Sequence, residues 1–140
     1  MLENLIIENF AIIEKVALQF DSGMSVLTGE TGAGKSIIID ALLMLTGGRA
    51  NSEMIRHGSK KAILQAVFSV PKNKILIDKL IENGIDIDDG ELIIYRELKH
   101  NGRSMIRINS VLVNLKTLSI IGKYLVDIQG PVSYTHIRAH

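Results

Sequence analysis

The chain has 140 residues, of which 46% are hydrophobic and 22% are charged; this is a globular composition and excludes an intrinsically disordered chain. The formal net charge of +1 neither requires nor excludes a nucleic-acid partner. The absence of cysteine excludes a disulfide framework and a thiolate metal site. No apolar run reaches the ~20 residues of a membrane span, and Leu5-Ile6-Ile7 is too short for a signal peptide, so we expect a cytoplasmic protein without a membrane partner.

Hydrophobic patterning divides the first part of the chain into strands and one helix. Leu2–Phe10 and Ile12–Phe20 are rich in β-branched and aromatic residues and are predicted as strands. Met24–Thr28 is a short apolar run that stops at a glycine, which is typical of a buried strand. Lys35–Thr46 is apolar nearly all round and is predicted as a buried helix that Gly47-Gly48 ends.

The second part of the chain is predicted to contain further strands and two helices. Lys72–Asn83 has apolar residues at helical spacing, with Gly84 placed to end the helix. Asn114 is expected to cap a short helix, and Asn101-Gly102 and Asn109-Ser110 are predicted as tight turns. The predicted strands are Ala62–Val70, Glu91–Lys99, Arg103–Asn109, Val111–Val113 and Tyr124–Ile128.

The chain is predicted to form one domain over residues 1–130, followed by a tail. Pro131–His140 has no periodicity and no acidic residue. We leave open whether this tail belongs to the natural chain, and we assign no role to His136 and His140.

The segment that carries chemistry is Gly29-Glu30-Thr31-Gly32-Ala33-Gly34-Lys35-Ser36, which matches G-x-x-x-x-G-K-[ST] at every fixed position. Its glycines let the backbone turn N–H groups toward a phosphate, and the helix after the motif adds the positive end of its dipole. Lys35 is predicted to contact the β and γ phosphates, and the Ser36 hydroxyl is predicted to bind Mg²⁺. A strand before the motif and a helix after it are the expected context. The motif therefore predicts ATP and Mg²⁺ as ligands.

Several segments also resemble a known family. The opening residues 5–10, the loop residues 27–36 and Asp40-Ala41-Leu42 are similar to chromosome-maintenance and recombination ATPases of the SMC and RecF kind, and more narrowly to the bacterial RecN family of DNA-repair proteins. Gly48-Arg49-Ala50 and residues 55–58 are similar to the next segments of that family, and the resemblance extends to about Gly130. It implies an α/β P-loop fold, the N-terminal lobe of an ABC-type ATPase head, with a mixed sheet and an antiparallel β layer.

The resemblance also implies partners and a division of labour. The C-terminal lobe of the same head, absent here, carries the signature motif, the Walker B acid and the switch histidine. A second head and DNA are the other implied partners, and the implied location is the nucleoid. Gln129 resembles the glutamine that joins the Mg²⁺ shell in SMC-type heads, but the sequence departs from the RecN family after Gly130, so the role stays open between Gln129 and a later residue. Because the chain has no complete catalytic set, we expect it to bind nucleotide without hydrolysing it.

Other functions remain open at this point. An ABC transporter ATPase subunit shares the motif, although the opening strands argue against it. A small-molecule P-loop kinase needs an arginine-bearing lid and an acceptor pocket, and the sequence shows neither. A nucleotide-binding module without catalysis is the third alternative.

Basic residues outside the motif have two interpretations each. Arg49, Arg56 and His57 come after the predicted helix and either reach the nucleotide or DNA, or lie in a solvated loop. Arg103 and Arg107 are predicted on one strand face, which either contacts a DNA backbone or faces water. The same hairpin carries Arg96 and Lys99, and Lys60 and Lys61 come directly before the predicted strand Ala62–Val70. Asp40, on the predicted helix, either supports the site or pairs locally.

Overall fold

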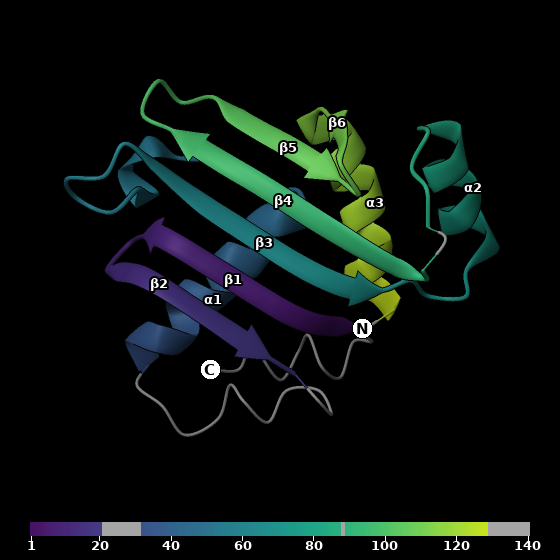
Figure 1. Cartoon of the computed structure of the whole chain (residues 1–140), viewed down its shortest axis with the longest axis horizontal. Helices are drawn as coiled ribbons and strands as arrows, with labels where there is room; N and C mark the ends of the chain where they lie inside the picture. Colours follow the sequence, from purple (N-terminus) through teal and green to yellow (C-terminus); the bar gives the residue numbers. More distant parts are fainter. Residues whose placement is uncertain (21–31, 88, 129–140) are drawn as a thin grey trace.

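A computed structural model describes residues 1–20, 32–87 and 89–128 of the chain. In these residues, six strands form one sheet in the order β2-β1-β3-β4-β5-β6, and every pairing is antiparallel. Helices α1 and α3 lie behind the sheet, and α2 lies beyond its end (Figure 1). The strands are β1 Leu2–Phe10, β2 Ile13–Gln19, β3 Lys61–Ser69, β4 Glu91–Lys99, β5 Ser104–Ile108 and β6 Val111–Val113. The helices are α1 Gly32–Leu45, η2 Ser52–Met54, α2 Lys74–Glu82 and α3 Leu115–Ile128.

Local sequence signals explain where most elements begin and end. Asn73 caps α2 by accepting hydrogen bonds from the N–H groups of Ile75 and Leu76, and Gly84 comes after the helix at φ 72°. The turn between β5 and β6 has positive φ at both Asn109 and Ser110, as the predicted tight turn requires. The strand and helix assignments up to residue 121 are thus confirmed wherever the structure describes them, with small differences in their ends.

The predicted final strand over Tyr124–Ile128 is wrong. These residues continue α3, which begins after the Asn114 cap and runs to Ile128. Buried Leu118, Ile121 and Leu125 share one helix face, so the helical period continues into the apolar run that suggests a strand. A short apolar run fits either structure, and here it continues an established helix, because no glycine or proline interrupts residues 123–128.

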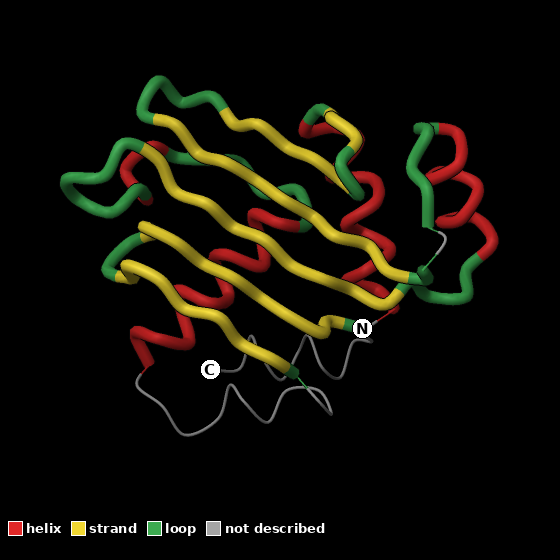
Figure 2. The backbone as a smooth tube through the Cα atoms, in the orientation of Figure 1, coloured by secondary structure: helices red, strands yellow, loops and turns green. Residues whose placement is uncertain are grey.

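Helix α1 is also less enclosed than its composition predicts. Ala41, Met44 and Leu45 are buried, whereas Leu43 is 43% exposed and Asp40 is exposed. Figure 2 shows α1 lying behind the sheet, which covers one side of the helix. The predicted strand Met24–Thr28, which would make the sheet mixed, and the predicted tail both lie outside the described residues.

The core lies between the inner face of the sheet and the two helices behind it. Alternate residues of each central strand point into it, as the period of a half-buried strand requires. The segment between α1 and β3 contributes as well, because Ile55 is buried and forms a bridge with Phe10. The fully buried side chains of the sheet include Leu5, Ile7, Leu64, Ala66, Leu92, Ile94 and Ile108.

Candidate functional site

The structure places the described part of the phosphate-binding motif at the start of a helix. Gly32 to Ser36 form the first turn of α1, while Gly29, Glu30 and Thr31 lie outside the described residues. Lys35 is half-buried and the side chain of Ser36 is exposed. The positive end of the α1 dipole therefore coincides with the lysine and the hydroxyl that the motif assigns to phosphate and Mg²⁺.

The charge pattern of α1 favours an external anion at this end. The first turn of α1 contains no acidic residue, although Asp or Glu is the usual stabilising choice there. Lys35 instead adds a positive charge to the positive end of the dipole. This combination suits an anionic ligand such as a phosphate group. Gln129, the other predicted Mg²⁺ ligand, lies outside the described residues.

The opposite end of α1 is held by Arg96, which the sequence places on the predicted hairpin without a role. Arg96 is only 1% exposed. Its Nη1 donates to the carbonyl oxygens of Met44 at 2.6 Å and Gly48 at 2.5 Å, and its Nε donates to Ser104 Oγ at 3.3 Å. Burial lowers the pKa of the Arg96 guanidinium, which stays charged because the ordinary pKa of arginine is so high. The alternation of buried residues along β4 puts this arginine on the inner face.

Two glycines bring α3 into backbone contact with the same end of α1. A Cβ atom at Gly122 would lie 2.2 Å from the carbonyl oxygen of Thr46, and a Cβ atom at Gly47 would lie 2.6 Å from Ser119 Cα. Neither position accepts a side chain without a backbone shift. Gly47 also has φ 119°, a conformation that other residues rarely adopt.

The remaining candidate residues do not gather into one cluster. Arg49 and His57 are exposed, and Arg56 is half-buried, with its backbone N–H donating to the carbonyl oxygen of Asn9 at 2.8 Å. Arg103 and Arg107 are exposed, as expected for the outer face of the hairpin. Within residues 1–20, 32–87 and 89–128, no group of three or more His, Cys, Asp or Glu side chains is arranged to hold a metal ion. None of the helices in this part of the chain is long and apolar enough to span a membrane.

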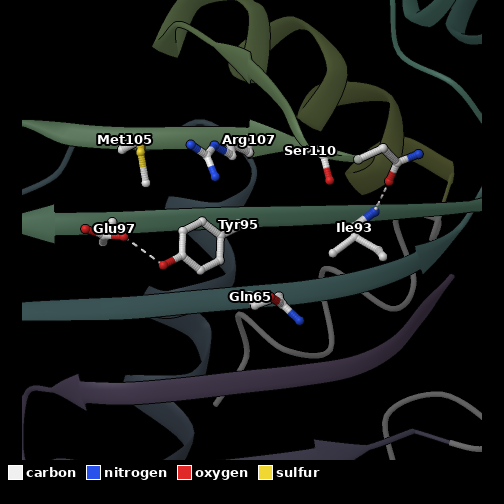
Figure 3. Close-up of a pocket in the computed structure, with 8 residues that line it drawn as sticks. Gln65, Ile93, Tyr95, Glu97, Met105, Arg107 and Ser110 are labelled. Carbon is white, nitrogen blue, oxygen red and sulfur yellow. Dashed lines mark hydrogen bonds between the residues drawn. The ribbon is translucent and has the colours of Figure 1, made fainter.

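The outer face of the sheet carries a hollow of about 290 Å³ that the sequence does not predict (Figure 3). Tyr95 Oη donates to Glu97 Oε2 at 2.7 Å, and Lys61 Nζ lies 3.6 Å from Glu97 Oε1. Burial and this hydrogen bond raise the pKa of Tyr95 to about 12, and the same bond lowers the pKa of Glu97. Both charge signs occur here, so the hairpin face is not a purely basic surface. The lining residues are Gln65, Ile93, Tyr95, Glu97, Met105, Arg107, Asn109 and Ser110.

The sheet, the helix order and the motif at the start of α1 define a P-loop nucleotide-binding domain of the kind found in SMC-type ATPase heads. A structure from work on ATP-driven dimerization and DNA-stimulated activation of SMC ATPases superposes with a TM-score of 0.69, at 26% identity, over 95% of this chain and 82% of that chain. The recombination mediator RecF has the same fold, with a TM-score of 0.62 at 18% identity over 84% of this chain and 29% of its own.

Residues 4–135 match the family model described as AAA domain, so the chain belongs to that family. It is similar to the DNA repair protein RecN of Bacillus subtilis (strain 168), with 45% identity over 130 residues that cover 93% of this chain and 23% of that protein. RecN of Vibrio cholerae serotype O1 is 40% identical over the same share of each chain. The chain thus spans 23% of the length of these relatives.

Proposed function

We propose that this chain is the ATP-binding lobe of a RecN-type ATPase that acts in DNA double-strand-break repair. The observation that carries the proposal is the position of the motif, with Lys35 and Ser36 in the first turn of a helix that the sheet supports. Similarity to RecN proteins over 93% of the chain agrees with it. An ABC transporter subunit, the main alternative, is disfavoured because the similar structures are SMC and RecF heads.

In this proposal the chain contributes binding and positioning. Backbone N–H groups at the start of α1 hold the phosphates, Lys35 neutralises charge on the β and γ phosphates, and Ser36 provides a hydroxyl for the metal. Mg²⁺, when bound with ATP, supplies charge neutralisation at the phosphates. A group that positions the attacking water, and charge stabilisation from a signature motif, come from the C-terminal lobe and a second head. DNA is the proposed regulator of the whole protein, in the cytoplasm at the nucleoid.

The first experiment measures Mg²⁺-dependent ATP binding and steady-state phosphate release by the chain. We expect Lys35-dependent binding without turnover, because the water-positioning group is supplied by another lobe. Lys35→Ala should weaken binding by about tenfold or more, since loss of one charge-assisted phosphate contact amounts to about 1.5–3 kcal/mol. Lys116→Ala, which removes a lysine of α3 far from the motif in sequence, is the matched control and should bind as the wild type does.

Two outcomes would contradict the proposal. Equal ATP affinities of the wild type and Lys35→Ala would show that the motif does not bind the phosphates. Lys35-dependent turnover at about 1 per second, the low end for phosphoryl-transfer enzymes, would mean that the chain holds a complete catalytic site. Turnover by the chain joined to its second lobe, with and without linear duplex DNA, then tests the role in repair.

A further inference from the structure

The C-terminal end of α1 is fixed from two sides by elements distant in sequence. On the sheet side, Arg96 of β4 donates to two carbonyl oxygens at this end, those of Met44 and Gly48. On the other side, the backbone of α3 at Gly122 touches the carbonyl of Thr46. The end of α1 therefore has little freedom to move along or across the sheet.

The charge on Arg96 is balanced in an uncommon way. The ion pair found within residues 1–20, 32–87 and 89–128 joins Lys61 and Glu97, so Arg96 has no carboxylate partner in that part of the chain. Its positive charge faces the negative end of the α1 dipole instead. A buried guanidinium without a carboxylate is costly to keep, and hydrogen bonds to oriented carbonyls offset that cost only when their geometry is maintained. The planar guanidinium thus links β4 to α1 in one fixed arrangement.

Fixing one end of a helix determines where its other end lies. α1 has 14 residues and is therefore about 21 Å long at ~1.5 Å per residue. A small tilt about its C-terminal end displaces Lys35 and Ser36 by much more than it displaces Met44. Phosphate contacts are sensitive to such shifts, because hydrogen bonds weaken steeply as their distances and angles depart from the optimum.

We propose that Arg96 is a positioning residue for the phosphate site, acting from the far end of α1 on the placement of Lys35 and Ser36. This inference rests on the proposed function, since it requires that the start of α1 binds nucleotide. A purely stabilising role would make stability and affinity fall together. A positioning role separates them, because Arg96→Met removes a costly buried charge and, at the same time, the hydrogen bonds that link β4 to the carbonyls of Met44 and Gly48.

The test compares Mg·ATP affinity with thermal stability in four variants of the chain. Arg96→Met and Arg96→Lys change the link to α1, and Ser104→Ala removes only the Nε partner. Leu80→Ala lowers stability by opening a cavity beneath α2 and serves as the control. Affinities are measured at a temperature at which each variant is folded by circular dichroism.

We expect Arg96→Met to bind Mg·ATP about tenfold or more weakly, Arg96→Lys to bind with intermediate affinity, and Ser104→Ala to lose less than either. Leu80→Ala should bind as the wild type does despite its lower Tm. If Arg96→Met does not fold, Arg96→Lys and Ser104→Ala still carry the comparison.

The outcomes separate this inference from the proposed function. Lys35-dependent binding by the wild type together with unchanged affinity in the folded Arg96 variants would overturn the positioning role alone. An equal affinity loss in Leu80→Ala would also overturn it, because general destabilisation would then explain the effect. A wild type that binds no Mg·ATP, or binds it independently of Lys35, would overturn both.

Discussion

The inner and outer faces of the sheet are built by the same strands but are stabilised by different interactions. On β4, Ile94 is fully buried against the helices, whereas its neighbour Ile93 is 39% exposed beside the hollow. Among the described residues, the inner face carries mostly apolar side chains, with Arg96 hydrogen-bonded to Ser104. The outer face carries Tyr95, Glu97 and Arg107 in a hydrogen-bonded, partly charged surface. The comparison indicates that burial stabilises one face and polar contacts stabilise the other.

The largest expected effect is the difference in stability lost when two neighbouring isoleucines of β4, one on each face, are shortened to alanine. Ile94→Ala should lower the free energy of unfolding by about 2–5 kcal/mol, because it leaves a cavity in a packed core. Ile93→Ala should lower it by less than about 1.5 kcal/mol, because water already reaches the side chain. Urea denaturation of both variants measures the difference. Similar losses at the two positions would mean that something covers the outer face as fully as the inner one.

A smaller effect is expected at Asn109, where the outer face ends. Its Oδ1 accepts from the N–H of Ile93 at 2.7 Å, and its Nδ2 donates to the carbonyls of Asp86 at 2.6 Å and Glu91 at 3.0 Å. Asn109→Ala should cost about 1–3 kcal/mol through lost hydrogen bonds and an unfavourable φ of 47°.

Asn109→Gly separates these two causes, because glycine adopts a positive φ without strain. It should unfold at a higher denaturant concentration than Asn109→Ala, while remaining below the wild type. Identical midpoints for the two variants would show that the positive φ contributes nothing at this turn.

The smallest effect concerns the pH dependence of the outer face. The pKa of Glu97 is lowered in the folded chain, so its contribution is present above the ordinary value of about 4.3 and is lost as the pH falls through the folded value. The pKa of Tyr95 is raised to about 12, so its contribution is present below about 10 and is lost as the pH rises toward 12. Tyr95→Phe should therefore lose the alkaline dependence and should cost about 1 kcal/mol at neutral pH.

Unfolding free energies at several pH values, for the wild type, Tyr95→Phe and Glu97→Gln, check this expectation. Glu97→Gln should remove the fall in stability at acid pH. It should weaken, without removing, the fall in stability above about pH 10, which is the ordinary pKa of tyrosine. An alkaline profile that Tyr95→Phe leaves unchanged would assign the titration to another group.

Local patterns predict most of the fold, and they fail where tertiary context decides. Alternation and turn sequences locate the strands and the Asn109-Ser110 turn, and the Asn114 cap locates the start of α3. The run at Tyr124–Ile128 fits a strand and a helix equally well, because it is short and mostly apolar. Only the packing of Ile121 and Leu125 on the core, along one helix face, determines the outcome.

The candidate site shows the same division. The fixed spacing of the motif predicts a helix from Lys35, because this chemistry is local in sequence, and the structure begins α1 three residues earlier, at Gly32. Strand alternation favours a buried position for Arg96, whereas its charge favours an exposed one, so the two signals conflict. The group to which Arg96 donates lies at the end of α1, far away in sequence. The contacts of Gly47 and Gly122 depend on how two helices meet, which no local pattern specifies.

β1 and β3 are neighbours in the sheet, yet β2, the phosphate-binding motif and α1 all lie between them in sequence. Leu98 pairs with Ser104 through a short hairpin, whereas Leu5 pairs with Ala66 only after a long loop has closed. Loop closure of this kind costs more chain entropy than a hairpin, and contacts of high sequence separation slow folding. The β1–β2 and β3–β6 units can therefore form early, and their docking along β1 and β3 is the expected slow step. Until that step, both strands present open edges, which makes the partly folded chain prone to intermolecular β pairing.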